Sequence, residues 1–455
     1  MAIGHSRTQR GPLHNRARPL AAPATQPYWL FVLFALYGPS INIIGEFRYV
    51  EIVVLVLLML NLQDALRYVG RWERIFAGLF LLTAFMQVIS DIVNDASVDG
   101  TLKRCFTYVI LALLIIAVRY LSRGDPARLR WILAGYCLSY VTMLFIGQTA
   151  SKNYADLAWR LGLGTAATIA VALVPLFLPR LYKLVGPALL AISAIHIAAG
   201  ARSVAALVAL AGLSATMSAY SQSFTPQRFR PLNIIAFAVV ATLAFTGAYF
   251  GAKSATEARM FPTELQEKME LQFSNPYGLL AAGRPDTVAA LYGVAKSPLL
   301  GFGSTNVDPD VYAVYLDVSN SSYIWTDSYD ALTDRAWSRE WVLGTPSHSH
   351  LFGAWVDAGL IAALSWAAVL FACLYVLQRT MFWQHPAQPL FVLVSLLSIW
   401  DVLFSPGPIR MDIAIRLAVL IYAIELLHAY DRTQDTAIQR RSSNLPPGLR
   451  RGGFQ

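Results

Sequence analysis

Two histidines stand where a long polar segment runs into an apolar one. They are His348 and His350, in the run Thr345-Pro-Ser-His-Ser-His-Leu-Phe-Gly-Ala-Trp-Val-Asp-Ala-Gly359. A neutral imidazole, whose unperturbed pKa is about 6.5, accepts a proton from a hydroxyl group at physiological pH. Helix capping or hydrogen bonding at a membrane surface would explain a histidine here equally well. The sequence offers a candidate general base and leaves open which of the two histidines it is.

Two arginines precede predicted helices on the same side of the membrane, Arg202 in the middle of the chain and Arg284 in the polar segment. A guanidinium group stays charged and binds phosphate oxygens through two parallel hydrogen bonds. The helix start beside Arg284 would add oriented N–H donors for an anion. Without an anion, Arg202 would extend to lipid headgroups and Arg284 would pair with a carboxylate. Lys103 and Arg104 are further cations on this side, which either bind an anionic ligand or mark a misplaced helix boundary.

Carboxylates and cysteines give weaker signals. Asp308-Pro-Asp310 has the Asp-x-Asp form that holds a divalent metal in many nucleotide-sugar transferases, but its proline favours a turn. Asp401 lies in an apolar run and is expected to pair within a helix bundle. The three cysteines lie in apolar runs with no zinc-site spacing, so neither a metal nor a cofactor is predicted; they are Cys105, Cys137 and Cys373.

The elements that position these residues are predicted to be membrane helices. The chain has 455 residues, of which 56% are hydrophobic and 14% are charged. Soluble domains are about 25% charged. Apolar runs of about 17–25 residues recur along the chain, each long enough to cross a hydrocarbon core of about 30 Å. Because every backbone polar group must be paired inside lipid, such runs indicate helices. The predicted fold class is an all-α polytopic membrane protein.

The alternation of basic loops predicts about twelve membrane helices with both termini in the cytoplasm. The second helix is expected over 49–63, and the last three over 350–378, 388–405 and 411–430. Segment 253–347 has twelve acidic and seven basic residues although the net charge of the chain is +9, so the basic excess lies in tails and short loops and argues against nucleic-acid binding. The predicted regions are a cytoplasmic tail (1–27), spans one to nine (28–252), a large periplasmic loop (253–349), spans ten to twelve (350–430) and a second tail (431–455).

Two helices are predicted inside the large loop, over 256–272 and from Pro285 to Lys296, where the proline suits a first helical turn. The turn-forming run Ser297-Pro-Leu-Leu-Gly-Phe-Gly-Ser304 follows the second helix. Residues 305–345 are rich in Tyr, Trp, Ser and Asp and show no clear helical period.

Three motifs together resemble the bacterial O-antigen ligase and polymerase superfamily over residues 195–365. Gly200-Ala-Arg-Ser203 is similar to the family's Ser-Arg-small pattern at an outer loop. Gly283-Arg284, followed by a helix and Pro298-Leu-Leu-Gly-Phe-Gly303, is similar to its Gly-Arg and Pro-Leu-x-Gly-x-Gly patterns. The run from His348 to Gly359-Leu-Ile361 is similar to its pattern of His-Asn, an acidic residue and Gly-Leu-Ile, with Ser349 in place of the asparagine.

The resemblance implies a GT-C-like fold and a metal-independent, inverting glycan transfer at the periplasmic face of the bacterial inner membrane. The donor would be a glycan on undecaprenyl diphosphate. The acceptor would be a sugar hydroxyl of lipid A–core for a ligase, which we favour, or another lipid-linked repeat for a polymerase. His348 would be the base and Arg202 and Arg284 would hold the diphosphate, with further substrate contacts from His350, Lys103 and Arg104.

A membrane lipid or glycan transporter is an alternative of a different class. It would predict internal repeats or paired broken helices near the middle of the membrane, and the sequence shows neither. The oligomeric state is left open.

Overall fold

The computed structural model describes residues 27–37, 40–42, 46–146, 159–220, 246–247, 249–251, 253–260, 263–278, 284–306, 308–320, 347–404 and 410–443. Within these ranges the protein is an all-α membrane protein with one small antiparallel hairpin, in which Ser40 pairs with Arg48. Most of the predicted ninth span (232–252), the tail 1–26 and residues 444–455 lie outside the described residues. The predicted C-terminal tail begins as helix, because the last helix continues to Ser443.

The elements before the large predicted loop are α1 (Tyr28–Ala35), β1 (Ser40–Asn42), β2 (Glu46–Arg48), α2 (Tyr49–Leu60), α3 (Leu62–Tyr68), α4 (Arg71–Val93), α5 (Val98–Ser122), α6 (Pro126–Ile146), the π-helical turn η1 (Trp159–Leu163), α8 (Gly164–Phe177), the 3₁₀ turn η2 (Pro179–Leu181), α9 (Tyr182–Ala198) and α10 (Arg202–Tyr220). The later elements are α12 (Thr263–Ser274), α14 (Pro285–Lys296), α15 (Pro309–Asn320), α17 (His350–Thr380), α18 (Gln388–Phe404) and α19 (Arg410–Ser443).

Six of the described helices are long and apolar enough to cross a membrane. They are α4, α5, η2 with α9, α10, α17 and the Arg410–Ala437 part of α19. The predicted second span is bent instead of straight, because α2 ends at Leu60 and α3 continues at 94° to it. Counting this pair as one span gives seven, and α8 and α18 are shorter apolar helices. The total of about twelve spans therefore stays a prediction.

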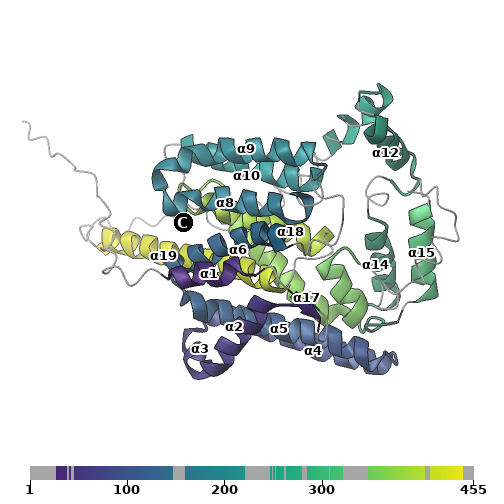
Figure 1. Ribbon diagram of the computed structural model, residues 1–455, viewed down its shortest axis with the longest axis horizontal. Coiled ribbons are helices and arrows are strands. Elements are labelled where there is room, and N and C mark those ends of the chain that lie inside the picture. The colour runs from purple at the N-terminus through teal and green to yellow at the C-terminus, as the bar shows by residue number, and fades with distance from the viewer. Residues whose placement is uncertain are drawn as a thin grey trace, which may run out of the picture.

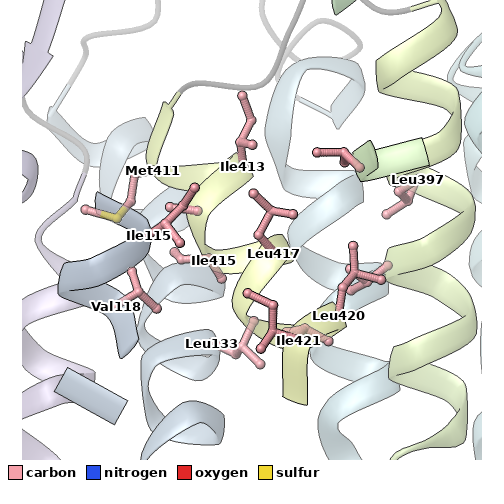
Figure 2. Close-up of a cluster of buried hydrophobic side chains, with 14 of the residues drawn as sticks. Ile115, Val118, Leu133, Leu397, Met411, Ile413, Ile415, Leu417, Leu420 and Ile421 are labelled. Carbon is pink, nitrogen blue, oxygen red and sulfur yellow. The ribbon is translucent and has the colours of Figure 1, made fainter. Parts of the chain in front are cut away.

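The centre of the bundle is built around α19. Its side chains pack against α5, α6 and α18, as Figure 2 shows for Leu417 and Leu420 among others. Two other helices, α9 and α10, approach closely at Gly186, where a Cβ atom would lie 2.6 Å from the backbone nitrogen of Thr216. Helices in lipid associate through such close packing, because lipid tails are as apolar as the side chains.

The helices of the predicted loop gather at one end of the bundle. Figure 1 shows α12, α14 and α15 beyond the ends of the long helices. The prediction of a helix from Pro285 to Lys296 is confirmed by α14. The helix predicted over 256–272 is interrupted instead, with a turn at Arg259, whose φ is 51°, before α12 begins. Helix α15 was not predicted from the sequence.

A break in α17 receives the segment that follows α14. At Gly359 the backbone leaves the helical conformation, with φ 79° and ψ −174°. The N–H of Phe302 donates to the carbonyl of Val356 (2.8 Å), and the N–H of Gly303 donates to the carbonyl of Asp357 (2.9 Å). In return, the N–H of Leu360 donates to the carbonyl of Pro298 (3.0 Å). These bonds attach the Pro298–Gly303 segment to α17.

The same segment is also attached to the end of α4. The backbone N–H of Ser304 donates to Asp91 Oδ1 (2.5 Å), a buried carboxylate that also accepts from the Gln87 side chain. From the preceding residue of α4, Ser90 Oγ donates to the carbonyl of Asp357 (2.8 Å). The break in α17, the turn after α14 and the end of α4 therefore form one hydrogen-bonded unit.

We expect the substitution Gly359→Ala to lower the free energy of unfolding by about 3 kcal/mol, because alanine disfavours this backbone conformation and its Cβ would overlap the carbonyl oxygen of Leu299. Thermal unfolding of the purified protein in detergent measures the effect. Gly78→Ala in α4 is the matched control, since no atom lies within 4 Å of a Cβ there. Equal melting temperatures for the two variants would contradict the prediction.

Candidate functional site

His348 and Asp286 bring α17 and α14 together. His348 lies two residues before the start of α17, and Asp286 lies in the first turn of α14. The Nδ1 atom of His348 contacts Oδ2 of Asp286. The Asp286 side chain is 9% exposed and that of His348 is 37% exposed. The contact therefore joins a buried carboxylate to an imidazole that remains partly open to the surface.

Arg284 stands beside this contact as the N-cap residue of α14. Its guanidinium carbon lies 5.8 Å from the ring centroid of Trp400, near the end of α18. Partial burial lowers the pKa of Arg284, and the nearby Asp286 carboxylate raises it. The group stays protonated, because its ordinary pKa is above 12. No carboxylate in the described part of the chain forms an ion pair with it, so the predicted pairing with a loop carboxylate is not found there.

Arg202 is positioned by a different pair of elements. It is the first residue of α10, directly after a turn in which Gly200 has φ 76° and Ala201 N–H donates to the carbonyl of His196 (2.8 Å). Glycine suits this position, because a helix that ends this way needs a left-handed residue. The exposed Arg202 contacts the sulfur of Met269 in α12 (Nη1 to Sδ, 3.2 Å) and has no described carboxylate partner. Of the three predicted catalytic residues, His348 contacts Asp286 in the first turn of α14, whose N-cap residue is Arg284, whereas Arg202 contacts α12.

His350, the other candidate base, points to a different environment. Its ring stacks on Trp366 of α17, with centroids 4.3 Å apart and planes 9° from parallel. A cavity of about 20 Å³, enough for about one water molecule, is lined by His350, Trp366, Asp401 and Arg416 among others. The Nε2 atom of His350 is buried. His350 thus belongs to the bundle interior, whereas His348 belongs to the contact with α14.

The sequence predicted that Asp401 pairs within the helix bundle, and the structure shows its partner. It forms an ion pair across the bundle with Arg416 of α19, and the two side chains are 16% and 11% exposed. A charge inside a membrane protein is costly unless it is paired. Asp401 is therefore a structural residue next to the His350 cavity.

Lys103 and Arg104 both have protein partners. Helix α5 begins at Val98, so the two cations lie inside its first two turns. Lys103 pairs with Asp99 one turn away (2.5 Å) on an exposed face, an arrangement that contributes little to stability. Arg104 Nη2 lies 3.3 Å from Oδ2 of the buried Asp357, at the break in α17. These contacts favour structural roles over the predicted substrate contacts.

The Asp-x-Asp motif is the start of a helix. Asp308 accepts hydrogen bonds from the backbone N–H groups of Asp310 (2.9 Å) and Val311 (3.2 Å), which caps α15. Lys296 donates to both carboxylates (2.7 Å each). Among the described residues, no group of three His, Cys, Asp or Glu side chains could hold a metal ion.

His196 is a partnered histidine of the bundle. It accepts a hydrogen bond from Trp159 Nε1 (3.1 Å) at Nδ1, and its Nε2 lies 3.1 Å from Thr168 Oγ1. Both ring nitrogens are therefore used in joining η1, α8 and α9.

Comparison with protein-family models, with curated proteins and with solved structures gives no match to this chain. The resemblance to the O-antigen ligase and polymerase superfamily therefore stays a prediction from the three motifs. Two of those motifs lie in direct contact, because the Pro298–Gly303 segment binds the break in α17 at Gly359, within the motif that begins at His348.

Sequence reasoning missed two residues of this site. Asp286 carried a usable signal, because it lies in the same first helical turn as the candidate Arg284. Its contact with His348 joins positions far apart in the chain, which no local pattern predicts. Trp400 gave no signal beyond being aromatic, and it belongs to the site because α18 ends beside α14.

We expect Asp401→Asn to destabilise the protein by about 3–5 kcal/mol, because it removes the ion-pair partner of the mostly buried Arg416. The double variant Asp401→Asn with Arg416→Met should unfold at a higher temperature than the single variant. Thermal unfolding in detergent measures both. Asp64→Asn, which breaks an exposed pair with Arg67, is the control and should change stability little. A single variant as stable as this control would refute the prediction.

Proposed function

We propose that the protein is an inverting, metal-independent glycosyltransferase that moves a glycan from undecaprenyl diphosphate to a sugar hydroxyl. We place the reaction at the periplasmic face of the bacterial inner membrane and favour lipid A–core as acceptor, which would make the protein an O-antigen ligase. The observation that carries the proposal is the contact of His348 with Asp286 in the first turn of α14, whose N-cap residue is Arg284, at one end of a membrane bundle.

The proposed leaving group, a diphosphate, explains the role of Arg284. A diphosphate takes the electron pair of the breaking glycosidic bond, so a fixed cation stabilises it most as that bond breaks. Arg284 is a partly desolvated cation with no described ion-pair partner, and it stands at a helix N-terminus that favours anions. Arg202, also without a described carboxylate partner, would bind the diphosphate as a second cation from the start of α10. This would require the donor to bridge α10 and α14.

The proposed acceptor, a sugar hydroxyl, explains the role of His348. The acceptor hydroxyl oxygen attacks the anomeric carbon from the face opposite the diphosphate, and the anomeric configuration inverts. His348 takes the hydroxyl proton as the new bond forms. Its side chain is the more suitable of the two candidate bases, because it is 37% exposed beside Arg284, whereas Nε2 of His350 is buried above Trp366.

A polymerase would use the same residues with another lipid-linked repeat as acceptor. The single compact polar segment and the chain length favour the ligase. A transporter is disfavoured by the way the break in α17 is filled. Broken helices of transporters line a cavity, whereas here the freed backbone groups bind the Pro298–Gly303 segment.

We expect the purified protein in detergent, with metals chelated, to transfer a lipid-linked glycan to lipid A–core. His348→Ala should lower the rate by about 10²–10⁴-fold through loss of the base. Arg284→Ala should lower it by about 10²–10³-fold through loss of charge stabilisation. Gel mobility of the core product measures transfer, and Arg67→Ala, whose side chain is 77% exposed and paired with Asp64, is the matched arginine control.

The products separate the alternatives. Longer lipid-linked chains without modified core would identify a polymerase. Absence of both products with competent donor and acceptor would overturn the transferase proposal, and an uptake or flipping assay would then be the next measurement.

A further inference from the structure

The carboxylate of Asp286 is buried against the candidate base, His348. Helix α14 itself does not require a buried carboxylate at this position. A carboxylate in a first helical turn stabilises the helix N-terminus from an exposed position as well. Here the side chain is 9% exposed and contacts Nδ1 of His348. We propose that Asp286 is a positioning residue, which accepts the Nδ1–H hydrogen bond of His348 and thereby directs Nε2 at the acceptor hydroxyl. This inference rests on the proposed glycan transfer.

Both members of the Asp286–His348 pair are anchored by the residues next to them. On the side of His348, Ser349 caps α17 by accepting from Phe352 N–H (3.1 Å) and donates to the carbonyl of Val402 in α18 (2.8 Å). These two bonds fix the backbone from which the imidazole projects, so His348 has little freedom to leave Asp286.

On the side of Asp286, α14 is held firmly against α17. At Gly293 the helices approach so closely that a Cβ atom would lie 2.7 Å from a methyl group of Val356. The turn after α14 is bonded to the break in α17 by Phe302 and Gly303. The position of Asp286 relative to His348 is therefore set by backbone contacts and does not depend on the pair itself.

The exposure of the His348 ring agrees with a ring in which Nδ1 faces Asp286 and Nε2 faces the acceptor. Its Nδ1 atom is buried, although the side chain as a whole is 37% exposed. The two ring nitrogens of a neutral histidine have opposite roles, one donor and one acceptor, and the partner of one fixes the role of the other. An Nδ1–H hydrogen bond to Asp286 would leave the free electron pair on Nε2.

The carboxylate also acts after the proton has moved. Transfer of the hydroxyl proton to Nε2 makes His348 an imidazolium, and the negative charge of Asp286 then lies against it. Arg284, at the N-cap of the same helix, is the nearby cation and faces Trp400 of α18. On α17, His350 faces Trp366. Asp286 is thus the anion that compensates the new charge on His348.

The test uses full-length protein in detergent with the lipid-linked donor and lipid A–core. For Asp286→Asn we expect kcat to fall by about 100-fold with an unchanged KM for the acceptor. The asparagine amide can donate to Nδ1 and thereby favours the neutral tautomer that carries the proton on Nε2, while the acceptor still binds. Asp286→Glu, which keeps the carboxylate, should restore most of kcat. Asp310→Asn, an exposed carboxylate of α15, is the matched control.

The outcomes separate this inference from the proposed function. An inactive wild-type protein with competent substrates overturns both. Active wild type and inactive His348→Ala, with wild-type kcat in Asp286→Asn, overturns the positioning role alone. A loss of kcat in Asp286→Asn that Asp286→Glu does not restore, accompanied by a lower melting temperature, shows a purely structural role and also overturns it.

Discussion

Backbone groups inside a membrane protein must find partners, and the break in α17 creates several that a continuous helix would have paired. The carbonyls of Val356 and Asp357 and the N–H of Leu360 are all satisfied by the Pro298–Gly303 segment. Because this segment directly follows α14, the same bonds fix α14 against the start of α17. The contact between His348 and α14 is thus supported by the hydrogen bonds at the break in α17.

The charges at this end of the bundle fall into two groups. Arg104 pairs with Asp357, and Arg416 pairs with Asp401, in each case with a mostly buried carboxylate. Removing one member of such a pair leaves an uncompensated charge, so these residues are coupled to folding. Arg202 and Arg284 have no described carboxylate partner, and both lie at helix starts. These two arginines are the cations that the proposed diphosphate binding would use.

The sequence predicted what local chemistry determines. Pro285 correctly predicted the start of α14. Helices α17 and α18 begin where the apolar runs begin. A local signal was also misjudged, since Asp308-Pro309 is a capping residue followed by a first-turn proline, and it opens α15. The contacts of Arg104 and Asp286 could not be predicted from the sequence, because their partners, Asp357 and His348, are distant in sequence. Such pairs follow from helix packing, which no spacing rule contains.

The choice between the two histidines, which their spacing left open, follows from where the helix begins. Ser349 is the N-cap residue, with extended φ and ψ, so His348 lies in the approach to the helix and His350 in its first turn. Their side chains therefore leave the backbone in different directions. His350 turns along α17 onto Trp366, and His348 turns across to α14 and Asp286. In the proposed function the diphosphate would bind at Arg284, two residues before Asp286, so the substrate would lie nearer to His348 than to His350. The helix start thus places His350 in the bundle and His348 at the contact with α14, although only Ser349 separates them.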